Sequence, residues 1–277
     1  MRLGISSYTY AWAVGVPGAP PERPLGANEL IERAANLGAD VLQIADNLPL
    51  QTWSAREIRG LTIRARDAGV KLELGTRGTA PAHVRRYLEL AHAVGSGLVR
   101  VVIDAPCDEP TPEEVVRRLA PLRDDFLTAG VTLAIENHDR FTTAELRWMI
   151  ASLGSDWAGI CLDTVNSLGA LEGPDVVIAT LAPLAVNLHV KDFIISRAWH
   201  AMGFTVEGRP AGQGRLNIHA LLATVAGAGR DLTAVVELWT PPEPRLADTI
   251  AKEAAWARES MAFLRAESGP SVSRPPR

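Results

Sequence analysis

Short apolar runs alternate with longer amphipathic segments along the whole chain. The apolar runs are near-continuous in aliphatic and β-branched residues, which is typical of parallel strands that are covered on both faces. Eight of these runs predict strands: residues 2–8, 40–46, 70–76, 98–104, 131–136, 158–163, 185–191 and 232–238. The pattern therefore predicts a parallel sheet with helices on both of its faces.

Helix boundaries between these strands carry the usual start and stop residues. Three amphipathic segments end near a glycine that suits the end of a helix, at Gly38, Gly69 and Gly95. Thr111 is followed by a proline and two glutamates, which predicts a capped helix start, and Thr142 begins a second start of this kind. Strands and helices thus follow each other in regular order.

Eight strands alternating with eight helices, at a spacing of about 27–38 residues for most units, match a closed (β/α)8 barrel. An open doubly wound sheet is the alternative, but it usually has a glycine-rich turn after its first strand, and none is visible there. We predict a single α/β domain, a (β/α)8 TIM barrel over residues 1–268, with a flexible tail over residues 269–277. Two long connections, residues 9–25 and 192–214, follow strands on the side where barrels place their active sites.

Composition agrees with this fold and removes several classes of function. Of 277 residues, 47% are hydrophobic and 22% are charged, and the net charge of −4 leaves no cationic excess for binding nucleic acid or a membrane surface. No apolar run reaches the ~18 residues of a membrane span, and the N-terminus does not resemble a secretory signal. Cys107 and Cys161 predict free, buried thiols in a reducing compartment. We therefore expect a cytoplasmic protein.

Titratable side chains lie at or near the ends of the last four predicted strands. They are Glu136, Asp163, His189 and Glu237. Each alone is more often a solvated loop residue, a helix cap or a satisfied core histidine. In a barrel, however, the carboxyl ends of neighbouring strands converge, and three carboxylates that meet there need a cation to remain ionised. Oxygen ligands with one histidine suit Mn2+, Mg2+ or Co2+, so the sequence predicts one divalent metal ion.

The strings that carry these four residues are IEN, CLDTVN, LHVKD and VVEL. In this order the chain resembles the xylose-isomerase-like TIM barrels, a family of sugar isomerases, ketose 3-epimerases, inosose dehydratases and, more distantly, abasic-site endonucleases. The resemblance covers essentially the whole chain and implies that Glu136, Asp163, His189 and Glu237 bind one divalent metal. It also implies that Glu136 and Glu237 flank the substrate as an acid/base pair.

Such a site supports several reactions of a carbonyl sugar. A metal on the carbonyl and the adjacent hydroxyl stabilises the enediolate that forms when an α-proton leaves, and its reprotonation gives epimerisation or isomerisation. Loss of CO2 from a β-keto acid reaches the same enediolate. Isomerase or epimerase chemistry is the broader prediction, and a decarboxylase or dehydratase of an oxo-sugar acid is the alternative. A non-catalytic sugar-binding barrel, a third hypothesis, has no need of the paired glutamates.

Two departures from the family's pattern narrow this prediction. Ketose 3-epimerases usually have a histidine three residues after the strand-six aspartate, and here that position is Asn166, which donates hydrogen bonds but cannot carry a proton. The endonuclease branch needs further histidines, but the chain has six in all, none at the ends of strands two and three. The loops WAVGVPG, ADNLPL, ENHDRF and HAMGF…GQG are similar to those of 3-oxo-isoapionate decarboxylases, which agrees with the missing histidine.

Cationic side chains after several strands favour an anionic sugar or sugar acid as the substrate, because arginine binds carboxylates and phosphates in a bidentate manner. The candidates are Lys191, Arg197, His200 and Arg209 after strand seven, with Arg77 and Arg140 after strands three and five. Taken singly, each of these cationic side chains is equally compatible with a solvated charge on a loop. Tyr8, Trp12 and Trp239 are candidates for stacking on the sugar, with filling of the core as the alternative.

His138 and Asn166 complete the candidate substrate contacts. For His138 three roles remain open: orienting Glu136, touching the substrate, or capping the following helix. Residues 212–214, Gly-Gln-Gly, either present backbone amides to an anion or turn the chain into the next helix. Barrels of this family often form homo-oligomers, a question that the sequence leaves open.

Overall fold

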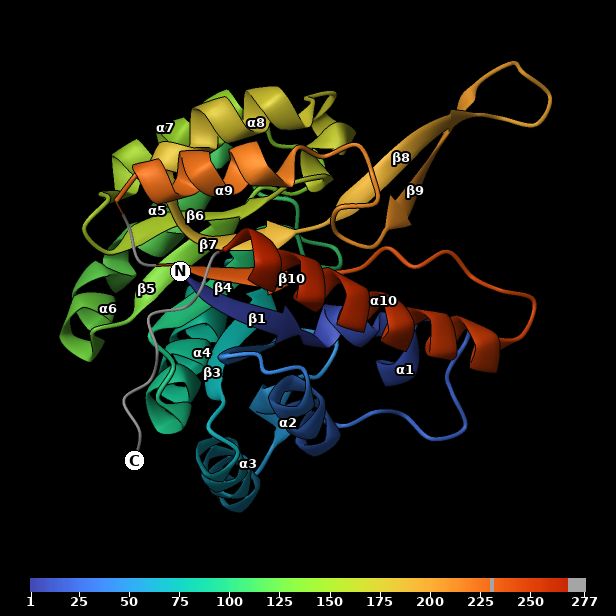
Figure 1. Cartoon of the computed structure of the whole chain (residues 1–277). Coiled ribbons are helices and arrows are strands. Elements are labelled where there is room, and N and C mark those ends of the chain that lie inside the picture. The colour runs from blue at the N-terminus through green and yellow to red at the C-terminus, as the bar shows by residue number, and fades with distance from the viewer. Residues whose placement is uncertain (230–231, 269–277) are drawn as a thin grey trace.

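The computed structural model describes residues 1–229 and 232–268, in which eight parallel strands close into a barrel surrounded by helices (Figure 1). The strands are β1 (Arg2–Ser6), β2 (Val41–Ile44), β3 (Lys71–Arg77), β4 (Leu98–Val102), β5 (Thr132–Glu136), β6 (Ala158–Asp163), β7 (Ala185–Val190) and β10 (Thr233–Val236). They follow one another around the barrel in chain order, and β10 closes it between β7 and β1. The predicted (β/α)8 TIM barrel is confirmed, while the predicted tail lies outside the described residues.

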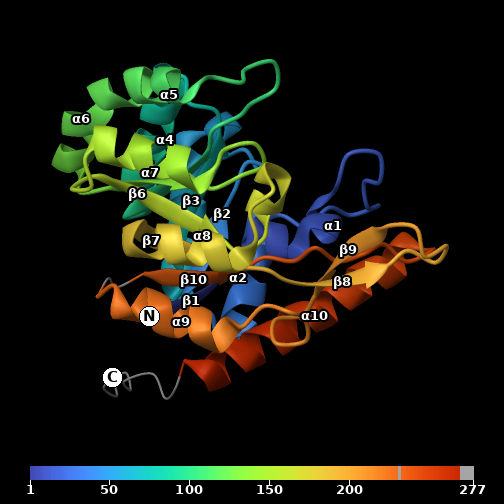
Figure 2. The ribbon, with the colours of Figure 1, turned by 90° about the horizontal axis from the view of Figure 1, so that it is seen from above.

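Helices cover the outer face of the barrel (Figure 2). The α-helices are α1 (Ala11–Val14), α2 (Ala27–Asn36), α3 (Ala55–Asp67), α4 (Pro81–Val94), α5 (Pro112–Leu119), α6 (Arg123–Ala129), α7 (Thr143–Leu153), α8 (Pro174–Leu181), α9 (Ile218–Gly227) and α10 (Leu246–Glu267), and the 3-10 turns are η1 (Ser7–Tyr10), η2 (Leu50–Thr52), η3 (Ala120–Leu122), η4 (Asn166–Ala170) and η5 (Ala182–Leu184). Thr111 and Thr142 cap α5 and α7, as predicted, each in a capping box with the glutamate three residues on. Gly95 ends α4 with a left-handed φ of 71°.

The connection after β7 differs from the long loop that the sequence predicts. Residues 192–209 form an antiparallel hairpin of β8 (Asp192–Arg197) and β9 (Phe204–Arg209), which projects from the barrel in both views (Figures 1 and 2). The carboxylate of Asp192 accepts hydrogen bonds from the backbone N–H groups of Gly212 and Gly214, each at 2.9 Å, and ties the two ends of the insertion together. The amides of the Gly-Gln-Gly segment therefore bind a carboxylate of the chain itself.

The hydrophobic core lies between the strands and the surrounding helices. Leu30 and Ile31 of α2 and Val84 of α4 are fully buried, and the rings of Phe126 and Trp157 pack at 5.5 Å. This is the arrangement that explains the near-continuous apolar strands, since each strand must pack both inward and against a helix.

Both cysteines are free thiols, as expected, but they differ in burial. Cys161 on β6 is buried, whereas Cys107 is exposed, so the expectation of a buried thiol was wrong for Cys107. Cys107 lies in a tight turn closed by the Ala105–Asp108 pair of backbone hydrogen bonds, which holds it outside the barrel. In residues 1–229 and 232–268, no helix combines the length and apolar character needed to cross a membrane.

Candidate metal and substrate site

The carboxyl ends of the last four barrel strands bring four titratable side chains together. Glu136 ends β5, Asp163 ends β6, His189 lies on β7 and Glu237 directly follows β10. None is more than 2% exposed. From Nδ1 of His189 the distances are 3.6 Å to Oε2 of Glu136, 3.8 Å to Oδ2 of Asp163 and 3.5 Å to Oε2 of Glu237. The four residues that the sequence predicts as metal ligands thus surround one point.

Each of the three carboxylates has one oxygen in a hydrogen bond and turns its other oxygen toward this point. Oε1 of Glu136 accepts from Nδ2 of Asn166 at 2.8 Å. Oδ1 of Asp163 accepts from the backbone N–H of Asn166 at 2.8 Å, and Oε1 of Glu237 accepts from the Ser6 hydroxyl at 2.8 Å. The orientation of every carboxylate is therefore fixed by its neighbours before any ligand arrives.

The imidazole of His189 is oriented in the same way from inside the barrel. Nε2 of His189 lies 2.8 Å from Oε1 of Gln43, whose own amide group donates to Glu73 and to Asn187. Because the amide NH2 of Gln43 is used in this way, its oxygen is the acceptor and Nε2 of His189 carries the proton. Nδ1 is therefore the nitrogen that faces the carboxylates and that would bind a metal ion there.

The atoms that face the common point fit a metal ion. Nδ1 of His189 is buried and has no hydrogen-bond partner among the described residues, and Oε2 of Glu136 and Oδ2 of Asp163 have only ion-pair contacts there. Such atoms are costly unless something else binds them. Ligands about 2.1 Å from one ion lie roughly 3.0–3.5 Å apart, close to the separations found here. Three carboxylate oxygens and one imidazole nitrogen suit a hard or borderline divalent ion.

Two buried cations lie against the carboxylates. Nζ of Lys191 is 2.7 Å from Oδ2 of Asp163 and 3.0 Å from Oε2 of Glu237, and it donates to Oδ1 of Asn166 at 3.3 Å. The ammonium also lies 5.9 Å from the centre of the Trp239 ring. Burial alone would lower the pKa of Lys191, but Asp163 and Glu237 outweigh it and raise the pKa above its ordinary value, so the side chain is charged.

Arg100 on β4 is the second buried cation. Its Nε is 2.5 Å from Oε2 of Glu136, in an ion pair whose N–H does not have the alignment of a hydrogen bond, and its Nη1 donates to Asp46 at 3.3 Å. Burial would raise the pKa of Glu136, but Arg100 and then His189 hold this pKa well below its ordinary value. Burial would also raise the pKa of Glu237, but the positive charges of His189 and Lys191 outweigh burial and lower this pKa to about 2. Both glutamates are therefore ionised at neutral pH.

The same cluster of charges shifts the pKa of His189 upward, in the opposite direction to the pKa values of Glu136 and Glu237. Burial acts to lower the pKa of His189, whereas Cys161, Glu237 and Glu136 raise it well above its ordinary value. Burial raises the pKa of Cys161 to about 11, so at neutral pH the thiol is uncharged and the glutamates supply the field. Cys161 also donates to Asn187 at 3.4 Å, which leaves the three carboxylates and His189 as the donor set. Three carboxylates and two cations, Lys191 and Arg100, leave one negative charge, which a proton on His189 or a bound metal ion can balance.

Several candidate substrate contacts line one side of the barrel mouth. The hydroxyl of Tyr8 donates to Oδ2 of Asp46 at 3.1 Å, and Nε of Arg77 lies 3.5 Å from the same oxygen. Burial, followed by the charge of Asp46, raises the pKa of Tyr8. Trp12 is half-buried and its indole N–H donates to the carbonyl of Thr240 at 2.9 Å. The structure thus brings Tyr8 and Arg77 together around Asp46.

The cationic residues after Lys191 lie on the hairpin and have partners there. The guanidinium of Arg197 stacks on the Phe204 ring at 4.4 Å. His200 is in the exposed loop at the tip of the hairpin, and Arg209 pairs with Glu207 at 3.2 Å. The structure therefore does not gather these three around the four strand-end residues as it does Lys191.

His138 points to a local partner. Its Nδ1 lies 2.8 Å from Oδ2 of Asp139, and its side chain is 24% exposed. Thr142, rather than His138, caps the helix that follows.

Arg140 is held by Asp104 in a bidentate pair with distances of 2.9 and 2.7 Å.

Sequence reasoning missed the polar residues in the middle of the barrel strands. They are Gln43 in VLQI, Glu73 in KLELGTR, Arg100 in LVRVV and Asn187 in AVNLHV, together with Asp46 after β2 and Ser6 at the end of β1. A single polar residue within an apolar strand was the signal that pointed to them. In a barrel this residue faces the interior, where it needs a polar partner.

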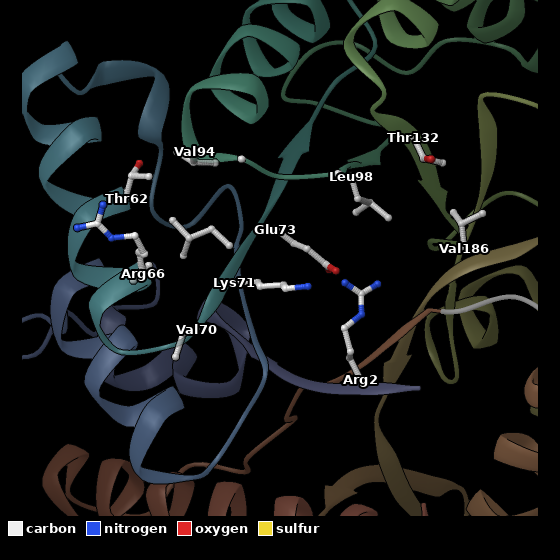
Figure 3. Close-up of a pocket in the computed structure, with 14 residues that line it drawn as sticks. Arg2, Thr62, Arg66, Val70, Lys71, Glu73, Val94, Leu98, Thr132 and Val186 are labelled. Carbon is white, nitrogen blue, oxygen red and sulfur yellow. The ribbon is translucent and has the colours of Figure 1, made fainter. Parts of the chain in front are cut away.

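A cavity of about 670 Å3 opens at the opposite end of the barrel (Figure 3). Residues at the amino ends of the strands line it, among them Arg2, Lys71, Leu98 and Thr132. In Figure 3, Arg2 and Lys71 point toward Glu73, whose carboxylate accepts one hydrogen bond from Nε2 of Gln43. The cavity is thus connected to His189 through two interior side chains, although it is remote from the strand-end residues.

Comparison with known proteins gives the class of this barrel. A family model of the xylose isomerase-like TIM barrel matches residues 31–267, and the chain belongs to this family, as its sequence resemblance implies. The chain is 35% identical over 266 residues to the 3-oxo-isoapionate decarboxylase of Pectobacterium atrosepticum, with 95% of each chain covered. A relative that matches nearly the whole chain is therefore named a decarboxylase.

Solved structures share the fold at lower identity. A D-psicose 3-epimerase crystallised in the presence of D-fructose has a TM-score of 0.74 at 19% identity, covering 97% of this chain and 100% of its own. A xylose isomerase-like TIM barrel protein from Mycobacterium smegmatis, in complex with magnesium, has a TM-score of 0.71 at 16% identity, covering 95% and 97%. These likenesses establish the architecture.

Proposed function

We propose that this protein is a divalent-metal-dependent decarboxylase of a small polyhydroxy 3-oxo acid. The observation that carries this proposal is Lys191, a charged and buried ammonium within 3.0 Å of both Asp163 and Glu237 at the centre of the site. A carboxylate substrate needs such a cation. The similarity to 3-oxo-isoapionate decarboxylase over 95% of the chain supports the same class of substrate.

The surroundings of the glutamates favour this reaction over epimerisation. An epimerase removes a proton on one face of the substrate and returns one on the other, so it needs two groups that exchange protons. Glu136 instead lies in an ion pair with Arg100 and accepts a hydrogen bond from the side chain of Asn166. Asn166 occupies the position where ketose 3-epimerases usually have a histidine. A decarboxylase needs only one proton delivery, which the charged ammonium of Lys191 is placed to make.

The proposed reaction proceeds as follows. The substrate carboxylate pairs with Lys191, and its 3-oxo oxygen lies next to the point that Glu136, Asp163, His189 and Glu237 surround. A divalent ion held by these four residues would stabilise negative charge on that oxygen. The bond between the carboxylate and the α-carbon breaks, CO2 leaves, and the electron pair forms the enediolate. The α-carbon then takes up one proton from the side of Lys191 and Glu237, which gives a ketose.

The test is CO2 release from freshly prepared 3-oxo sugar acids by the protein supplied with Mn2+, measured in a coupled assay. Loss of the ammonium in Lys191→Met should lower kcat/KM by roughly 10²–10⁴-fold, the range for a group that acts in the transition state. Lys252→Met, which removes a surface ion pair with Glu243, should leave turnover unchanged. Absence of CO2 release from every 3-oxo acid tried, or an active Lys191→Met variant, would contradict the proposal.

Ketose epimerisation or isomerisation is the second candidate, because Glu136 and Glu237 both border the space in front of His189. Turnover in D2O separates the two reactions. A decarboxylase adds one deuterium to the product at the carbon that lost CO2 and leaves free ketoses unlabelled. An epimerase exchanges the α-hydrogen of D-fructose or D-psicose without any acid substrate, and such exchange would favour the second candidate.

A further inference from the structure

The cavity at the amino end of the barrel has the size and the mixed lining of a small-molecule site. Its volume of about 670 Å3 lies within the roughly 300–1,000 Å3 that such sites usually span. Apolar side chains form part of its wall, namely Val94 of α4, Leu98 of β4 and Val186 of β7. Gly95 and Gly97 also line it, and a Cβ added at either would meet no atom within 4 Å. The cavity therefore leaves room for a ligand.

Cationic side chains dominate the charged part of this lining. They are Arg2 at the start of β1, Arg66 on α3 and Lys71 at the start of β3, against the carboxylate of Glu73. Figure 3 shows Arg2 and Lys71 pointing into the cavity. Arg66 donates to Asp67 at 3.0 and 3.2 Å, so this pair adds little net charge. Arg2 and Lys71 together thus give the cavity a positive excess over Glu73.

The charge of Glu73 is stabilised from inside the barrel and does not depend on Lys71. Oε1 of Glu73 accepts from the hydroxyl of Thr233 at 2.7 Å. Oε2 accepts from Nδ2 of Asn187 at 2.9 Å and from Nε2 of Gln43 at 3.3 Å. The ammonium of Lys71, by contrast, has neither a hydrogen bond nor an ion pair within residues 1–229 and 232–268. A positive charge without a partner at the edge of a cavity attracts an anion.

The rest of the wall suits the carbon part of a ligand with a hydroxyl group. In Figure 3, Leu98 lies between the cationic side chains and the pair of Thr132 and Val186. Thr132 is half-buried at the start of β5, and its hydroxyl makes no hydrogen bond to any other residue that the structure describes. This hydroxyl is therefore available to a polar atom of a bound molecule.

We propose that this cavity binds a small organic phosphate, with its phosphate group held by Arg2 and Lys71. A phosphate ester carries about −1.5 to −2 charges at neutral pH, which two cations match better than they match a single carboxylate. Arginine binds phosphate oxygens in a bidentate manner, and lysine acts on them as a point charge. A short hydroxylated carbon chain would lie on Leu98 and reach Thr132. Inorganic phosphate would contact the cations but leave this wall to water.

The test is calorimetric titration of glycerol 3-phosphate into protein freed of metal with EDTA, in a low-salt buffer without phosphate. One molecule should bind per chain, more tightly than inorganic phosphate does. Lys71→Met should raise the Kd of both ligands roughly tenfold or more, because it removes the ammonium. Thr132→Val keeps the shape of the side chain and should raise the Kd of glycerol 3-phosphate alone, about three- to tenfold. Lys252→Met, at a lysine of α10 paired with Glu243, is the matched control and should bind as the wild type does.

Absence of binding up to millimolar glycerol 3-phosphate would overturn the proposal. Unchanged affinity in Lys71→Met would do the same, because the phosphate would then lie elsewhere on the molecule. Inorganic phosphate that binds as tightly as glycerol 3-phosphate would contradict an organic ligand and assign the cavity to free phosphate.

The variant and the conditions keep this test independent of other properties. Lys71 is exposed and is the first residue of β3, so circular dichroism and Tm of Lys71→Met should show an intact fold. Binding is measured without metal or substrate, so the result does not depend on whether the protein releases CO2.

Discussion

The carboxylates of Glu136, Asp163 and Glu237 each divide their two oxygens between two tasks. One oxygen of each is fixed by a neighbour, and the other faces the point where a metal would lie. His189 divides its two ring nitrogens in the same manner, with Gln43 holding Nε2. The geometry of the site is therefore set by Asn166, Ser6 and Gln43 before any ligand binds, which is how preorganised sites avoid reorganisation on binding.

This arrangement makes Gln43 a positioning residue. Replacing it in Gln43→Met keeps a similar shape but removes the acceptor for the Nε2 proton of His189, so the ring loses its fixed tautomer and orientation. We expect Mn2+ affinity, measured by calorimetry, to fall about 10–100-fold, the usual effect of losing such a contact. Gln213→Met, at an exposed glutamine that donates to Glu259, is the control. Equal affinities in all three proteins would show that His189 is held without Gln43.

The sequence predicted the strand-end residues because their position is periodic: each follows an apolar run, and the carboxyl ends of parallel strands share one side of the barrel. It did not predict Arg100 or Gln43, since a polar residue within a strand indicates either face until the closure of the barrel is known. Nor could it pair Lys191 with Asp163 and Glu237, because this contact depends on side-chain conformations on three neighbouring strands.

The longest helix, α10, anchors the loop that follows β1. The carboxylate of Glu253 on α10 is fully buried and accepts hydrogen bonds from the backbone N–H groups of Trp12 and Ala13, at 3.0 and 3.2 Å. Burial opposes ionisation more strongly than these two hydrogen bonds favour it, and the pKa of Glu253 rises to about 7. A titratable group of the fold itself thus changes charge near neutral pH.

Because the pKa of Glu253 is higher in the folded chain than in the unfolded one, the folded state binds more protons between about pH 4.5 and 7. The contribution of Glu253 to stability is therefore greatest below this range and is lost as the pH rises through it, by at most roughly 3 kcal/mol. Chemical denaturation at several pH values should show a flatter profile for Glu253→Gln than for the wild type. Parallel profiles would show that Glu253 is already ionised at pH 5.

The strands of the barrel were easier to predict than the hairpin that is inserted after β7. The eight strands were found within one or two residues at most ends, because long apolar runs have few alternatives to burial. The hairpin β8–β9 was expected to be a loop, since its strands are rich in polar residues and its six-residue connection lacks the tight Asn-Gly or Asp-Gly turn that marks a hairpin. Asp192, which ties its ends together, acts through backbone amides that no sequence pattern displays.

The barrel as a whole should gain stability from the ion that its site fits. A ligand that binds only the folded state stabilises it by about 2.7 kcal/mol at a hundred times its Kd, which corresponds to roughly 5–10 °C in Tm for a chain of this size. We expect thermal denaturation of EDTA-treated protein to move upward by this amount with excess Mn2+. Glu237→Gln should show a much smaller shift. A wild-type Tm that does not respond to Mn2+, Mg2+ or Co2+ would argue against the metal site.

The interior hydrogen bonds from Glu73 through Gln43 to His189 have a consequence for how this protein can evolve. In many barrels the amino end of the strands sets stability and the carboxyl end sets chemistry, so the two can change independently. Here a substitution at Arg2 or Lys71, whose side chains point toward Glu73, should move the Glu73 carboxylate. Gln43 would pass this movement on to the imidazole of His189 at the other end of the barrel. Mutations selected at the base for robustness will therefore be epistatic with those selected at the mouth for a new substrate.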